Sequence, residues 1–379
     1  MRIPLQHQEC HERSVGAEQA VLSAERKAPV WSWNRAQCTC LQVLKYLLQD
    51  LGDEHRDLLD KPAVGDATPL FIASQNGHRG VVALLLQMRA QYKPTEDLSS
   101  PLLVAAQNGH LQVVEILWEM LKEDAGLNMS KRGGATPLYI ACQNGHLDVV
   151  KKLIDLEAEV NKCLDTHETP LFIACQGGYL DVVTVLMEKK ADVDKAKQDG
   201  ASPLYIACQN GHVEVVRYLL VVSTRKPDKN QANTNQEPWP KKRTRLSLCI
   251  ASASISPSSL ISAFRSSVTK ATPLFIASQK GHQIIVELLL HDPAAEVDKA
   301  LKSGATPFYI AALKGHPGVL QRLREAGAAL NSTPKHGATP VSAAVQNGHL
   351  EVLQLLIEMR ADLGKPNADG MSPLHLGGA

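Results

Sequence analysis

Histidines recur at regular places in this sequence and are the first residues to consider for chemistry. Each follows a glycine: His78, His110, His146, His212, His282, His316 and His349. A catalytic base is needed once, in one special environment, so a histidine repeated along the chain is expected to be structural. Phosphate-binding glycine loops, nucleophile elbows and H-E-x-x-H zinc motifs are not found in the sequence. We therefore expect no enzyme activity, no catalytic residue and no cofactor.

Cysteines recur in the same way. Cys142, Cys175 and Cys208 stand at the same place in three successive copies of one segment and are expected to pack as small apolar side chains. Other cysteines and histidines lie near the N-terminus, but their H-x-x-C-H and C-x-C spacings match no standard zinc pattern, so we expect no metal site. The cysteines are expected to be reduced, which favours an intracellular compartment.

The elements that position these residues are best seen in residues 136–154. Thr136 is a good helix N-cap, and Pro137 suits the first helical position. Asn144-Gly145 predicts the end of this helix, because glycine adopts the left-handed conformation at low cost. A second helix with an apolar face is predicted from His146. Neither helix is long enough to be stable alone, so each must pack against a neighbour.

The neighbours are copies of the same segment. Copies begin at Thr68, Ser100, Thr136, Thr169, Ser202, Thr272, Thr306, Thr339 and, in shortened form, Ser372. Apart from the wide gap after Ser202, the spacing is about 33 residues, which is typical of stacked helical hairpins.

With its T-P-L-x-x-A and G-H motifs at this spacing, the chain resembles the ankyrin-repeat family. The resemblance implies an all-α solenoid of stacked helix-turn-helix units with short β-hairpin fingers. The histidine common at the fourth position in the family appears only as His375. Most other copies carry an aromatic residue there, such as Phe172 or Tyr309, and we expect aromatic packing to replace the histidine.

The predicted organisation has four parts. Residues 1–40 show no repeat, and 41–222 form a first block of repeats with a degenerate N-terminal cap. Residues 223–270 are a polar, basic insert or a degenerate repeat, and 271–379 form a second block with an incomplete last repeat. We expect the insert to interrupt stacking, so that the solenoid behaves as two blocks.

The resemblance implies that partners bind the concave surface, made of fingers and the exposed side of the first helices. One candidate set is a glutamine column: Gln75, Gln107, Gln143, Gln176, Gln209, Gln279 and Gln346. An asparagine follows most of these glutamines, and a basic column stands seven residues before several copies: Lys61, Lys162, Lys195, Lys299 and Lys365. Both columns have an alternative reading as surface or helix-end residues. Variable finger positions are expected to set specificity: Arg132, Asp165, Glu168, Gln198, Asp199, Lys302, Lys335 and His336.

These observations predict a non-enzymatic scaffold or adaptor that binds other proteins, in the cytoplasm. One alternative is a regulatory ankyrin arm of a larger enzyme or channel. Another is a nuclear adaptor imported through the basic cluster Lys241, Lys242, Arg243 and Arg245. The net charge of +1 indicates no general attraction to nucleic acid or membranes, and apolar runs are too short for membrane insertion. No small-molecule substrate is expected.

Overall fold

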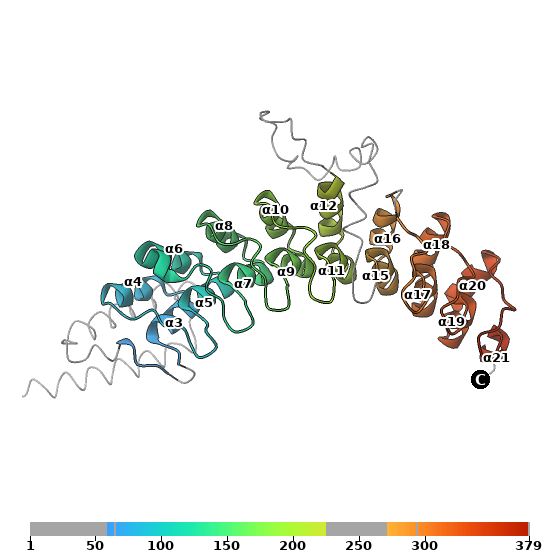
Figure 1. Ribbon diagram of the computed structural model, residues 1–379, viewed down its shortest axis with the longest axis horizontal. Helices are drawn as coiled ribbons and strands as arrows, with labels where there is room; N and C mark the ends of the chain where they lie inside the picture. Colours follow the sequence, from blue (N-terminus) through green and yellow to red (C-terminus); the bar gives the residue numbers. More distant parts are fainter. Residues whose placement is uncertain (1–58, 64–65, 225–270, 293–294, 378–379) are drawn as a thin grey trace, which may run out of the picture.

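The computed structural model describes residues 59–63, 66–224, 271–292 and 295–377. Within these ranges, helix pairs stand side by side in a curved row (Figure 1). In each complete pair, the first helix lies on the inner side of the curve and the second on the outer side. The predicted solenoid is therefore confirmed. The residues 1–58, which include the proposed capping repeat, and the basic cluster at 241–245 lie outside the described part.

Each first helix begins directly after its capping residue. The first helices are α3 (Pro69–Gln75), α5 (Pro101–Gln107), α7 (Pro137–Asn144), α9 (Pro170–Gly177), α11 (Pro203–Asn210), α15 (Pro273–Lys280), α17 (Pro307–Lys314), α19 (Pro340–Gln346) and α21 (Pro373–Gly377). The Thr136 hydroxyl accepts a hydrogen bond from the Tyr139 N–H at 3.1 Å, and proline fills the first helical position, as expected. Gly145 ends α7 at φ 73°, in the left-handed region that favours glycine.

The second helices form the outer row. They are α4 (Arg79–Gln87), α6 (Leu111–Leu121), α8 (Leu147–Asp155), α10 (Leu180–Glu188), α12 (Val213–Thr224), α16 (Gln283–Leu290), α18 (Pro317–Glu325) and α20 (Leu350–Glu358), and the short 3-10 helix η3 (Lys122–Ala125) follows α6. In α8, Val149, Val150, Leu153 and Ile154 are buried. The apolar face of each helix is thus covered by its own partner and by the adjacent pairs.

One apolar core runs through the stack, from Leu59 to Ala361. The cysteines of the repeated column are fully buried in it and free of disulfides, as predicted. Four of the six fourth-position aromatic residues are also buried, for example Phe172 at 2% and Tyr309 at 5% exposed, while Phe71 and Tyr205 are half-buried. At these positions an aromatic side chain packs where the family has a histidine.

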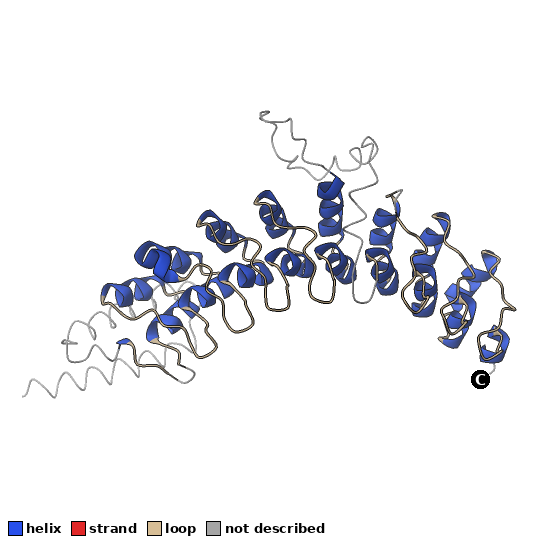
Figure 2. Ribbon diagram, in the orientation of Figure 1, coloured by secondary structure: helices blue, strands red, loops and turns tan. Residues whose placement is uncertain are grey.

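The fingers are hydrogen-bonded turns, and no described residue is in a β-strand (Figure 2). In the finger at 164–168, the Leu164 N–H donates to the Glu168 carbonyl at 2.9 Å, and the His167 N–H donates to the Leu164 carbonyl at 2.9 Å. Because these two bonds close a tight turn, the finger has no β-ladder. Successive fingers are tied by a backbone bond, such as Gln198 N–H to Thr166 O at 3.0 Å.

The stack continues across the insert. Helix α11 packs against α15, and α12 packs against α16. The His282 ring bonds the Gln209 carbonyl at 3.2 Å and lies against Gly211. The expected interruption of stacking at the insert is therefore not observed, because the helix pair before the insert packs against the helix pair after it. Whether the solenoid behaves as two blocks stays a prediction.

Candidate protein-binding surface

The recurrent histidines join each repeat to the one before it. In six repeats the imidazole Nε2 bonds a carbonyl at the end of the preceding first helix, at 2.9–3.2 Å. His146, for example, bonds the Gln107 carbonyl at 2.9 Å. We call this set the histidine ladder: His110, His146, His212, His282, His316 and His349. Helix-end carbonyls lack partners within their own helix, so the ladder satisfies them. The predicted structural role of these histidines is confirmed.

The asparagines that follow the glutamine column serve the same carbonyls. The side-chain amides of Asn108, Asn144 and Asn210 donate to the preceding repeat's helix-end carbonyl at 3.1, 2.8 and 2.8 Å. These amides stabilise the stack and are not presented to a partner. The reading of the asparagines as part of a polar ladder along the groove is replaced by this structural role.

The ladder changes at one joint. Tyr179 stands where a histidine is expected, and Gly177 stands where an asparagine is expected. The tyrosine ring fills the space over Gly145 and Gly177, where an added Cβ on Gly177 would come within 2.3 Å of it. No bond from either position reaches Gln143 in the described structure. The joint between the pairs α7–α8 and α9–α10 therefore relies on packing alone at this point.

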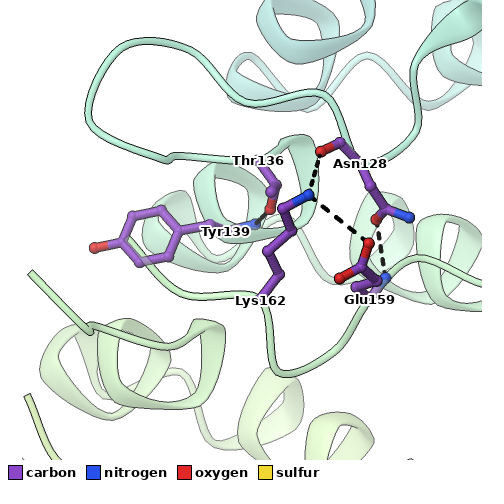
Figure 3. A network of polar contacts seen from close by, with 5 residues as sticks. All are labelled: Asn128, Thr136, Tyr139, Glu159 and Lys162. Atoms are coloured by element: carbon purple, nitrogen blue, oxygen red, sulfur yellow. Dashed lines mark hydrogen bonds and ion pairs between the residues drawn. The ribbon is translucent and has the colours of Figure 1, made fainter. Parts of the chain in front are cut away.

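The lysine column is also used within the stack. Lys162 Nζ donates to the Asn128 carbonyl at 3.0 Å and lies 3.7 Å from Glu159, while the Glu159 N–H donates to Asn128 Oδ1 at 2.9 Å (Figure 3). Lys195 and Lys365 reach Asn161 and Asn331 in the same way, at 3.1 and 3.4 Å. Lys299 instead pairs with Glu296 at 2.9 Å. Three of the five lysines of the basic column therefore join neighbouring repeats, a role that neither reading of the column from the sequence contained.

The glutamine side chains remain available. Five are exposed and two are half-buried, the latter being Gln209 and Gln279. The backbone carbonyls of several of them accept from the histidine ladder, but within the described residues no side-chain hydrogen bond holds the glutamine amides. Their role in partner binding stays a prediction.

The finger residues form a second exposed group on the inner side of the curve. Arg132, Asp165, Gln198, Asp199, Lys302, Lys335 and His336 are exposed, and Glu168 is half-buried. Asp199 Oδ1 accepts from the Ala201 N–H at 3.0 Å, which stabilises its own turn.

Two finger residues are held by tyrosines of the fourth position. The Tyr139 hydroxyl donates to Glu168 Oε2 at 3.0 Å, and Lys197 Nζ lies 2.7 Å from Glu168 Oε1. Burial, with the adjacent charge of Glu168, raises the pKa of Tyr139, and the hydrogen bond to Glu168 raises the pKa of Lys197. The Tyr309 hydroxyl lies 3.2 Å from His336 Nε2. Glu168 is therefore half-buried and held by contacts within the stack, whereas His336 contacts one tyrosine and stays exposed.

Two family models match this chain. One, described as ankyrin repeats (3 copies), matches residues 93–163, 158–233 and 248–334. The other, described as ankyrin repeats (many copies), matches residues 341–377. The chain belongs to the ankyrin-repeat family. Ankyrin repeats generally mediate protein–protein interaction, and they are typically non-enzymatic modules.

Solved structures include relatives of this ankyrin-repeat chain. A search of curated proteins finds no match. Among solved structures, the crystal structure of the human ASB11 ankyrin repeat domain is similar at 26% identity, with a TM-score of 0.49. The similarity covers 64% of this chain and 91% of that chain.

The histidine, cysteine and acidic side chains of the ankyrin-repeat stack can be compared with what a metal site or a reactive thiol needs. No cluster of three or more histidine, cysteine or acidic side chains lies close enough to hold a metal ion there. Burial raises the pKa of the thiols of Cys142, Cys175 and Cys208, so these cysteines are poor nucleophiles. Among the helices that the structure describes, none has the length and apolar character needed to span a bilayer.

Sequence reasoning missed two sets of residues in this ankyrin-repeat chain. The asparagines that accept from the lysine column were not recognised as lysine partners, although Asn128, Asn161 and Asn331 all stand eight residues before a repeat start. The bonds from Tyr139 and Tyr309 to the next finger were also missed. The sequence signal for these bonds would have been a polar residue about 28 positions after each tyrosine.

Proposed function

We propose that this chain is a non-enzymatic scaffold or adaptor that binds partner proteins through its inner surface. The exposed finger tips and the glutamine column would make the contacts. The observation that carries this proposal is the division of polar residues between two tasks. The histidine, asparagine and lysine columns hold the stack together, whereas the glutamines and most finger tips are left exposed on one side.

A stack of this kind suits extended binding because it offers a long, preformed surface. Each repeat is fixed by its neighbours, so little conformational entropy is lost when a partner binds. The fingers differ in sequence while the helices are nearly identical, so the fingers are the better source of specificity. The free, buried cysteines support a reducing compartment, and we propose the cytoplasm.

Site-specific photocrosslinking in cells tests this proposal. A photoreactive amino acid is placed in the full chain at Gln176 or Gln198 on the inner side. The matched controls carry it at Lys151 or Glu188, which are exposed on the second helices. We expect discrete protein adducts from the inner positions and none from the outer ones. Adducts of equal yield from both sides, or adducts from neither, would contradict binding through the inner surface.

A further inference from the structure

Neighbouring fingers in the first half of the stack carry opposite charges. Lys131 and Arg132 follow a finger with Asp97, and the Arg132 N–H donates to the Asp97 carbonyl at 2.9 Å. The pKa of Asp97 is held low, first by a hydrogen bond from Thr95 and also by the charge of Lys131. Further along the row, Lys197 Nζ on one finger lies 2.7 Å from Glu168 Oε1 on the finger before it. Opposite charges across adjacent turns therefore stabilise this part of the finger row.

The fingers at 301–305 and 334–338 break this arrangement. They carry Lys302 on the first and Lys335 and His336 on the second, and all three side chains are exposed. No carboxylate within ion-pair distance of these three side chains is found in the described part of the chain. We call Lys302, Lys335 and His336 the basic finger pair. Like charges on adjacent fingers repel each other, which is unfavourable in the free protein.

The two fingers are fixed relative to each other. The Lys335 N–H donates to the Ser303 carbonyl at 2.8 Å. Gly304, at φ 83°, lets the next finger approach closely, because a Cβ there would lie 3.2 Å from the Pro334 Cα. The Tyr309 hydroxyl holds the imidazole of His336. The positive groups are thus presented on a preformed backbone.

Acidic residues on the neighbouring links do not pair with the basic finger pair. Glu296 pairs with Lys299, and Asp298 accepts from the Ala329 N–H at 3.1 Å. Asp369 lies on the next finger, which is tied to this one by the Ala368 N–H and the His336 carbonyl at 3.3 Å, but it makes no ion pair with Lys335. Within the described part of the chain, Lys302 and Lys335 therefore have no ion-pair partner and can accept one from a ligand.

We propose that the basic finger pair binds an acidic segment of a partner protein, with carboxylates placed between Lys302 and Lys335. This inference rests on the proposed function and specifies the chemistry of the partner at one part of the inner surface. A peptide is favoured over a nucleic acid for two reasons. The patch is small, and the described surface around it exposes no large aromatic side chain on which bases could stack.

The test uses the full chain and a fluorescein-labelled hexaglutamate peptide, followed by fluorescence anisotropy at low and moderate salt. The test variant is Lys302→Glu/Lys335→Glu. The matched control is Arg79→Glu/Lys151→Glu, which makes the same change in net charge at exposed positions of the second helices. A labelled hexauridylate is run in parallel. Circular dichroism checks that each variant is folded.

We expect hexaglutamate to bind the natural chain more weakly as salt rises, and the test variant to lose affinity by about tenfold. The control variant should lose no more than about threefold. Equal losses in both variants, or no binding of hexaglutamate to the natural chain, would overturn the proposal. Tighter binding of hexauridylate, lost in the same test variant, would assign the patch to nucleic acid instead. The photocrosslinking from the inner positions is unaffected by these outcomes, so it separates failure here from failure of the proposed function.

Discussion

At six joints of the stack a single imidazole bonds one repeat to the one before it, so its removal has a local and measurable effect. His146→Ala removes the bond to the Gln107 carbonyl and the packing of the ring against Gly109. We expect a loss of about 1–2 kcal/mol in the free energy of unfolding, measured by urea titration. Gln143→Ala, which shortens an exposed side chain in the same repeat, should change stability by less than about 0.5 kcal/mol. Equal effects of the two changes would contradict the structural role of the histidine.

Residue chemistry also predicts a loss of stability in alkaline solution. Burial raises the pKa of Tyr92 to about 12, and its hydroxyl donates to the Ala125 carbonyl at 2.7 Å. The unfolded chain ionises this group near its ordinary pKa of about 10, whereas the folded chain keeps it protonated. Its contribution is therefore complete below pH 10 and is lost as the pH rises toward 12. In urea titrations across this range, Tyr92→Phe should show a shallower decline than the natural chain.

At the scale of helices, the joint at Tyr179 can be restored to the common pattern. In the double variant Gly177→Asn/Tyr179→His, the new side chains can reach the Gln143 carbonyl as their equivalents do elsewhere. We expect about 1 kcal/mol of added stability in chemical unfolding, from the hydrogen bonds and from the better helix propensity of asparagine. Gly177→Asn alone should be destabilising, because its Cβ would meet the Tyr179 ring. Additive effects of the two substitutions would count against this account.

Another element-scale prediction concerns the end of α8. Glu157 has φ 68°, in the left-handed region, and lies just beyond the negative end of the helix dipole. The equivalent position after α18 is Gly327, with φ 87°. Glu157→Gly should therefore stabilise the chain by about 1 kcal/mol, through relief of backbone strain and of charge repulsion. Lys151→Gly, at an exposed position in the middle of α8, is the contrasting change and should be destabilising.

At the scale of the whole molecule, the contact between α11 and α15 predicts that the insert is not needed for stacking. Replacing residues 225–270 with a copy of the link at 189–200 should give a chain that unfolds in one cooperative transition. The unfolding midpoint should equal or exceed that of the natural chain, because a shorter link costs less closure entropy. Calorimetry or circular dichroism during heating provides the measurement. Two separated transitions would show that the blocks depend on the insert.

The fold could be predicted from sequence because its signals are local and repeated. Thr136, Pro137 and Gly145 specify helix ends within a few residues, and the repetition indicates stacking. Continuity across the insert could not be predicted, because it depends on surfaces that meet only after folding. For the candidate site, the glutamines and finger tips were recognised, but the use of Lys162 within the stack required its distance to Asn128. A lysine at a regular spacing has the same sequence pattern whether it faces a partner or a neighbouring carbonyl.

The uniform ladder between repeats has a mechanical consequence. When the two ends of the chain are pulled apart, the load passes through one interface after another. Among the complete helix pairs that the structure describes, every interface but one contains an imidazole bond. Extension should therefore proceed in steps that each release about 33 residues, or roughly 110 Å of chain, apart from a longer step that includes the insert. The joint beside Tyr179, which lacks the imidazole bond, is where rupture should begin.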